Sequence, residues 1–149
     1  GEPAVMGLYD INIDVGAVTF EAGNDLYPKV LEDFEDLPLT TADATGLKGK
    51  LTTWTLENAT VEEPVDSMGN GQRVVKMGHL SKVTSDNLQG QTLRTLDFTV
   101  RNGGAQVRFA LRGSTNVTDW TVLPTVGGKA QATTINKNAS KTFHYRSIQ

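Results

Sequence analysis

Apolar and polar residues alternate with a period of two along much of the chain, a pattern that predicts β-strands with one buried face. The alternation is strict from Leu8 to Val15, where the apolar members are Tyr9, Ile11, Ile13 and Val15. Gly16 interrupts the pattern before Val18 and Phe20 resume it. Because an isolated glycine in a strand often marks an irregularity, a bulge or bend is expected at Gly16.

The clearest pair of strands is predicted at Leu93–Asn102 and Ala105–Ser114. Each segment places three large apolar residues on one face: Leu96, Phe98 and Val100 in the first, and Val107, Phe109 and Leu111 in the second. The connecting Asn102-Gly103-Gly104 holds residue types that readily adopt the positive φ of a tight turn. Pairing about Asn102-Gly103 or about Gly103-Gly104 keeps both apolar sets on the same side. The sequence therefore predicts a β-hairpin here.

Shorter strand signals recur elsewhere. They occupy Leu51–Leu56, Asn58–Val61, Arg73–Met77, Leu80–Val83, Trp120–Leu123, Ala130–Ile135 and Phe143–Ile148. Turns are expected at 127–128 and 136–138, and loops at 40–49 and 62–71. The segment Tyr27–Leu39 fits a short helical turn or an irregular edge strand, and the strand is preferred. About nine strands at roughly 8–12-residue spacing predict one all-β domain over residues 1–149, an antiparallel two-sheet β-sandwich, with 1–28 as an added N-terminal strand region.

The charge, the cysteine content and the apolar runs of the chain exclude several classes of partner and site. The chain of 149 residues has a net charge of −3 and a pI near 5.3, which argues against nucleic acid and against anionic lipid surfaces as partners. It has no cysteine, so disulfides, thiolate metal sites and cysteine nucleophiles are excluded. No apolar run approaches the roughly 18 residues of a membrane span, so no membrane insertion is expected.

A set of motifs in fixed order resembles a known family. It begins with Phe34-Glu35-Asp36, and continues with Trp54, Asn58-Ala59, Gly71–Met77, Ser81–Val83, Leu93–Arg112 and Trp120. In this order the chain resembles the galactose-binding-like jelly-roll modules of secreted and surface proteins of Gram-negative anaerobes. The resemblance covers residues 30–149, about four-fifths of the chain, and leaves Leu8–Phe20 unaccounted for. It implies a jelly-roll sandwich, a secreted or cell-surface location in a bacterium, a carbohydrate-binding or adhesive role, and one structural calcium near the first strand.

Catalytic chemistry has little support in the sequence. The two histidines, His79 and His144, lie in or next to predicted strands, and no G-x-S-x-G elbow accompanies them. Acidic residues cluster at 32–36 and 62–66, but neighbours in one loop rarely reach the spacing across a cleft that a glycosidase needs. The chain is therefore not expected to be an enzyme.

Calcium is the one metal for which the sequence suggests ligands. Calcium takes six to eight oxygen ligands, and the acidic segment Asp33–Asp36, above all Glu35 and Asp36, would supply carboxylates. No D-x-D-x-D-G loop is present, so this expectation rests on the resemblance. The alternative is an acidic edge strand without a metal.

Candidate ligand-binding residues lie on the polar face of the predicted hairpin and in one aromatic. Arg101, Arg108 and Arg112 would offer fork-shaped donors to sugar hydroxyls or carboxylates. The alternative is cross-strand ion pairing, with Asp97 near Arg108. Trp54 is expected in the core, whereas Trp120 follows a loop and is a candidate for stacking on a sugar ring.

These observations favour a non-catalytic binding module of an exported or cell-surface protein that recognises a glycan or another surface component, such as a surface protein. The alternative is a structural or assembly subunit joined through strand edges, because the alternating strand at Leu8–Val15 could complete a neighbour's sheet. An accessory domain of a hydrolase is the third reading. No cofactor is required by any of them.

Overall fold

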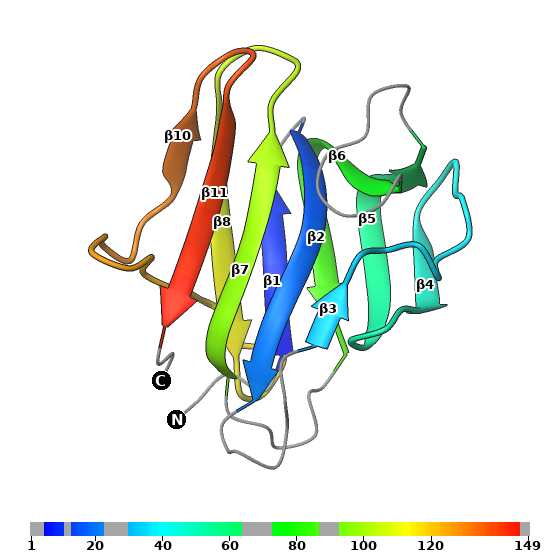
Figure 1. Cartoon of the computed structure of the whole chain (residues 1–149), viewed down its shortest axis with the longest axis horizontal. Helices are drawn as coiled ribbons and strands as arrows, with labels where there is room; N and C mark the ends of the chain where they lie inside the picture. Colours follow the sequence, from blue (N-terminus) through cyan, green and yellow to red (C-terminus); the bar gives the residue numbers. More distant parts are fainter. Residues whose placement is uncertain (1–4, 11–12, 23–29, 64–72, 87–92, 147–149) are drawn as a thin grey trace.

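The computed structural model describes residues 5–10, 13–22, 30–63, 73–86 and 93–146, and these form eleven β-strands (Figure 1). In chain order they are β1 (Val5–Asp10), β2 (Ile13–Ala22), β3 (Val30–Glu32), β4 (Ala44–Lys48), β5 (Thr53–Glu62), β6 (Val74–Ser85), β7 (Leu93–Arg101), β8 (Val107–Ser114), β9 (Thr121–Val122), β10 (Thr133–Ile135) and β11 (Ser140–Arg146). No described residue lies in a helix. Every recorded strand pair is antiparallel, which confirms the all-β prediction.

The strands join in one hydrogen-bonded network, whose main path runs β10-β8-β1-β6-β2-β7-β11. β3 branches from β2, β9 from β8, and β5 with β4 from β6. The described part of the N-terminal region therefore contributes central strands: β1 lies between β8 and β6, and β2 lies between β6 and β7. The pairing of β2 with β7 shifts register between Val15 and Val18, which confirms the irregularity expected at Gly16.

The hairpin predicted from Leu93 to Ser114 is wrong in its pairing, although its two strands lie close to their predicted bounds. β7 pairs with β2 and β11, whereas β8 pairs with β1, β9 and β10. The two strands instead contact each other through their apolar faces, where the rings of Phe98 and Phe109 meet edge to face with centroids 5.7 Å apart. Gly103 does not adopt the positive φ expected of a hairpin turn. The alternating pattern fits a hydrogen-bonded hairpin and also two strands that contact each other through their apolar faces, because it requires only that one face of each strand be buried.

Asn102 directly follows β7, in the connection between β7 and β8, which we call the crossing. Its side chain stabilises this connection. Its side chain is fully buried. The Nδ2 group donates to the carbonyl oxygens of Ala105 (2.8 Å), Ile135 (3.1 Å) and Asn136 (3.3 Å). The Oδ1 atom accepts the N–H of Gly104 at 2.9 Å. A buried amide that uses both of its ends in this way satisfies backbone groups that the crossing would otherwise leave without partners.

A group of aromatic rings fills the core beside this crossing. Phe98 stacks on Phe143 with centroids 5.4 Å apart and on Tyr145 with centroids 6.0 Å apart. Phe109 lies 5.1 Å from Phe143. All four side chains are buried, and burial raises the pKa of Tyr145 well above its ordinary value. Offset and tilted ring pairs of this kind stabilise a core beyond the area that they bury.

Several segments fold differently from their predictions. The loop expected at 40–49 contains β4, and the strand expected across 27–39 is limited to β3 in its described part. β5 and β6 each join two strands that were predicted as separate. Near both predicted breaks the backbone is irregular, with positive φ at Asn58 (53°) and Leu80 (52°). The register of β5 and β6 shifts between Glu57 and Ala59, and the two strands pair on both sides of this irregularity. His79, which lies between the two strands predicted at 73–77 and 80–83, is therefore part of β6.

Candidate functional site

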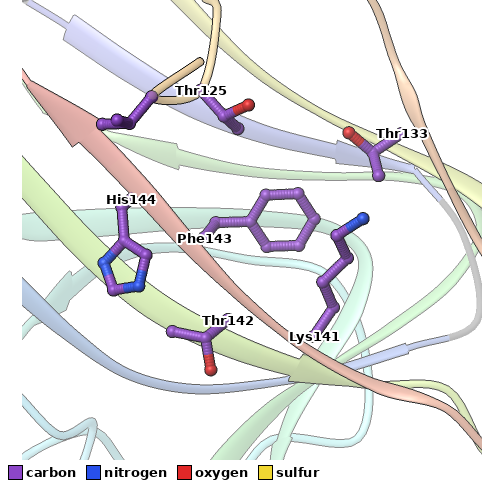
Figure 2. A pocket seen from close by; sticks show the side chains of 7 residues that line it. Thr125, Thr133, Lys141, Thr142, Phe143 and His144 are labelled. Atoms are coloured by element: carbon purple, nitrogen blue, oxygen red, sulfur yellow. The ribbon is translucent and has the colours of Figure 1, made fainter. Parts of the chain in front are cut away.

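An open hollow lies beside the two strands that end the main sheet path, β10 and β11 (Figure 2). Its volume is about 600 Å³. Its lining residues are Thr125, Val126, Thr133, Lys141, Thr142, Phe143 and His144. Thr133 belongs to β10, residues 141–144 belong to β11, and residues 125–126 belong to the segment after β9. Three segments that are separate in the sequence therefore line one hollow, which has both polar and apolar walls.

β11 forms one wall of the hollow, and alternation divides its side chains. Phe143 and Tyr145 are buried, whereas Thr142 and His144 are exposed. The carbonyl oxygen of His144 accepts the N–H of Val126 at 2.9 Å, so the backbone groups of His144 point away from β7. Because residues two apart in an antiparallel strand direct their backbone groups to the same edge, the N–H and C=O of Thr142 also point to this outer edge.

Hydrogen bonds to β7 fix the exposed side chains of β11. His144 Nδ1 lies 2.6 Å from Asp97 Oδ1, and Thr142 Oγ1 lies 3.0 Å from Thr99 Oγ1. Each pair joins residues that are directly opposite in the register of the two strands. Cross-strand pairs of this kind hold both side chains in one orientation. The side chains of Thr142 and His144 are therefore fixed against β7.

Phe143 lies at the base of the hollow, and polar ends surround it. Figure 2 shows the ammonium end of Lys141 and the hydroxyls of Thr125 and Thr133 around this ring. The ring is only 2% exposed, so it forms a floor and offers no broad stacking surface. No described residue forms an ion pair with Lys141. The hollow thus combines hydroxyl groups and a cation around a closed apolar base, whereas the side chains of Thr142 and His144 lie on the opposite face of β11.

The structure does not bring the three predicted arginines together. Arg101 alternates with buried Val100 on β7, and Arg108 and Arg112 alternate with buried Phe109 and Leu111 on β8. Since the apolar faces of β7 and β8 point toward each other, their polar faces point in opposite directions. The cross-strand pair expected between Asp97 and Arg108 is therefore wrong.

The two tryptophans have different environments. Trp54 is fully buried, as predicted. Trp120 is half-buried just before β9. It is not among the residues that line the β10–β11 hollow. Its assignment as a stacking residue stays a prediction.

The acidic segment that carries the calcium prediction is occupied by basic side chains and by backbone donors. Lys50 Nζ lies 2.7 Å from Asp33 Oδ1 and 3.1 Å from Asp36 Oδ1. Glu35 Oε2 accepts the backbone N–H of Arg73 at 2.6 Å, and the Arg73 guanidinium donates to the carbonyl oxygens of Glu35 and Leu37. Within the described ranges, no three His, Cys, Asp or Glu side chains gather as a metal site would require. Calcium binding at Glu35 and Asp36 stays a prediction.

Replacing Lys50 by methionine should lower the melting temperature by a few degrees near neutral pH and by less at both extremes of pH. Burial by itself raises the pKa of Asp33, but the hydrogen bonds from Lys50 and from the Glu35 N–H outweigh it and lower that pKa. Its contribution to stability is present above the unfolded value of 3.8 and is lost as the pH falls through the lower folded value. The hydrogen bonds to Asp33 and Asp36 raise the pKa of Lys50 to about 12, so its contribution is present below 10.5 and is lost as the pH rises through about 12.

Circular dichroism melts of wild type, Lys50→Met and Lys48→Met across pH test this pairing. Lys48 is an exposed lysine for which no described ion pair is recorded, so its variant matches the change of charge. A Lys50→Met difference that stays constant down to pH 2 would contradict the pairing.

Glu32 is the one member of the acidic segment whose side chain is fully buried. Its carboxylate accepts the indole N–H of Trp54 at 2.8 Å and the backbone N–H groups of Phe34 and Leu51 at 3.2 Å each. Phe34 has a φ of 64° and packs edge to face on Trp54 with centroids 5.7 Å apart. The carboxylate thus joins the turn after β3 to the start of β5. This role is not visible in the sequence, because an acidic residue within an acidic run has the pattern of a solvated one.

A second hollow of about 250 Å³ lies on β5 and β6 beside the irregularity at Asn58. Its two carboxylates already take part in local structure. Asp43 Oδ1 accepts the N–H of Asn58 at 2.8 Å, and Glu62 Oε2 accepts the hydroxyl of Thr60 at 2.7 Å. We therefore take the β10–β11 hollow, which is larger and whose lining contains no carboxylate, as the candidate site.

Comparison with family models, with curated proteins and with solved structures found no match to this chain. Within the described part of the chain, no helix is long and apolar enough to cross a membrane.

Proposed function

We propose that this domain is a non-catalytic binding module that takes a glycan in the β10–β11 hollow. The observation that carries the proposal is the lining itself: the side chains of Thr125, Thr133 and Lys141 surround an open hollow of about 600 Å³. Hydroxyl and ammonium groups are donors and acceptors that complement sugar hydroxyls.

We also infer that the sheet network closes into a two-layer jelly-roll sandwich. The ring contact between β7 and β8, which are not hydrogen-bonded to each other, supports this arrangement. β6 supports it as well, because its first part pairs with β2 and its last part pairs with β1. In such a fold β10 and β11 would end the two layers on the same side, with the hollow between them. The likeness to galactose-binding-like modules, and with it export to the cell surface, remains part of this proposal.

Replacing Thr133 by valine should weaken glycan binding about threefold to tenfold. Valine keeps the shape and the β-propensity of threonine but removes the hydroxyl at the hollow, and one hydrogen bond contributes about 0.5–1.5 kcal/mol. The measurement is a glycan array with the wild-type domain, followed by titration calorimetry with the best ligand. Thr134→Val is the matched control, because Thr134 is the next residue of β10 and is not part of the lining.

Two results would count against the hollow as the site. One is an array without any bound glycan. The other is binding that Arg108→Ala abolishes while Thr133→Val leaves it unchanged, which would place the ligand on the opposite face of β8.

A second function, assembly through strand edges, is favoured by the position of β11. This strand ends the main sheet path, and in the described part of the chain its outer edge has one backbone hydrogen bond, from Val126 to His144. β1 and β2 pair within the chain itself, so this second proposal uses the edge of β11 in place of the N-terminal strand. Sedimentation velocity across a wide concentration range distinguishes the two functions, since assembly requires species larger than the monomer.

A further inference from the structure

Charge is distributed unevenly along the chain, and the hollow lies in its basic part. All 17 acidic residues precede Trp120. The basic residues after that point are Lys129, Lys137, Lys141 and Arg146. The segments that line the hollow, residues 125–126, 133 and 141–144, all come from this acid-free stretch. The wall of the hollow therefore contains no carboxylate, although the protein as a whole is acidic.

The neighbouring carboxylate does not neutralise the hollow. Asp97 lies opposite His144 in the register of β7 and β11, and its oxygen is 2.6 Å from the imidazole. Lys141 belongs to the other face of β11, because it is two residues from buried Phe143 and three from exposed His144. Lys50 and Arg73, by contrast, are engaged by carboxylates in the acidic half of the protein. Lys141 is thus a cation that is available at the rim of the hollow.

We propose that the ligand of this hollow is an anionic glycan, one whose sugars carry carboxylate or sulfate groups. The ammonium group of Lys141 contacts the anionic group, and the hydroxyls of Thr133 and Thr125, which flank the same ring in Figure 2, bind neighbouring sugar hydroxyls. Charge-assisted hydrogen bonds are about twice as strong as neutral ones, so the anion supplies much of the selectivity. This inference rests on the proposed function and adds the class of ligand to it.

Two matched pairs of polysaccharides test the class of ligand. Polygalacturonate and its methyl-esterified form share a backbone and differ in carboxylate charge, and dextran sulfate and dextran differ in sulfate charge. We expect the domain to bind at least one anionic member about tenfold more tightly than its neutral partner in titration calorimetry. The pair that shows the preference identifies carboxylate or sulfate as the anion.

Variants at Lys141 test whether the preference for anionic polysaccharides arises in the hollow. Lys141→Met should lower affinity for the anionic member about tenfold and leave affinity for the neutral member unchanged, whereas Lys141→Arg should retain most of the binding. Lys48→Met, on β4, removes the same charge outside the hollow and should have no effect. Raising salt from 50 mM to 500 mM should weaken wild-type binding more than Lys141→Met binding, because salt screens the ion pair.

The outcomes separate this inference from the proposed function. Equal affinity for anionic and neutral members, or a preference that Lys141→Met does not reduce, overturns the anionic class and leaves a neutral glycan site. Absence of binding to all four polysaccharides and to every glycan on the array overturns both.

Discussion

Replacing Asn102 by aspartate should lower the free energy of unfolding by about 3–5 kcal/mol, a large fraction of the stability of a domain of this size. The substitution keeps the shape but exchanges the Nδ2 donor for an oxygen. That oxygen would face the carbonyl oxygens of Ala105, Ile135 and Asn136 in a fully buried position. Three hydrogen bonds become three repulsive contacts, and a carboxylate is buried without a cation.

Urea unfolding followed by far-ultraviolet circular dichroism measures this effect as a shift of the midpoint at constant m value. Asn138→Asp is the matched control. Asn138 is an exposed residue in the neighbouring turn with a φ of 61°, a conformation that asparagine and aspartate both tolerate. We expect the control to change stability by less than about 0.5 kcal/mol. Similar losses in both variants would show that Asn102 has no special part in the crossing between β7 and β8.

Replacing Gly49 by alanine should lower the free energy of unfolding by about 2–4 kcal/mol. A Cβ atom at this position would lie 1.9 Å from Glu32 Oε1 and 2.7 Å from its carboxyl carbon. The carboxylate would have to move, and it would then lose the indole N–H of Trp54 and the N–H of Leu51. The cost comes from buried donors that lose their partner, because a shifted carboxylate cannot satisfy them.

Gly103→Ala is the control, because an added Cβ there meets no atom within 4 Å and the backbone is outside the left-handed region. It should change stability by less than about 0.5 kcal/mol. A double-mutant cycle assigns the loss to the carboxylate: with Glu32→Asp present, the shorter side chain leaves room, and Gly49→Ala should cost less than in the wild type. Additive losses in the cycle would mean that Gly49 is intolerant for a reason other than Glu32.

The candidate site could be predicted in part. The exposed position of His144 between buried Phe143 and Tyr145 follows from alternation in the last strand, and the absence of acidic residues after Asp119 is visible in the sequence. The hollow itself could not be predicted, because its walls come from residues 125–126, 133 and 141–144. Only the packing of these segments places them side by side. The row of Arg101, Arg108 and Arg112 was inferred from the polar face of a hairpin between β7 and β8, and these two strands do not pair with each other.

Local signals also failed at two single residues. Asn58 and Leu80 looked like ends of strands, yet β5 and β6 continue through them with positive φ at each. Buried polar groups were equally invisible, since the types of Glu32 and Asn102 are common on surfaces. Their roles depend on backbone donors and acceptors that arrive from other segments of the chain.

By itself the sequence determined that this protein is built from antiparallel strands, where most of them lie and which of their apolar side chains share a face, because a period of two dictates the faces of a strand. It did not determine the partners of each strand. The apolar face formed by Leu96, Phe98 and Val100 must be covered by other apolar residues. Packing within a hairpin and packing against a strand beyond a crossing both satisfy this requirement. In the tertiary structure, β2 and β11 flank β7. The buried amide of Asn102 forms hydrogen bonds with backbone groups in the crossing between β7 and β8. As a result, the polar faces of β7 and β8 point in opposite directions, and β11 lies at the end of the main sheet path beside the hollow.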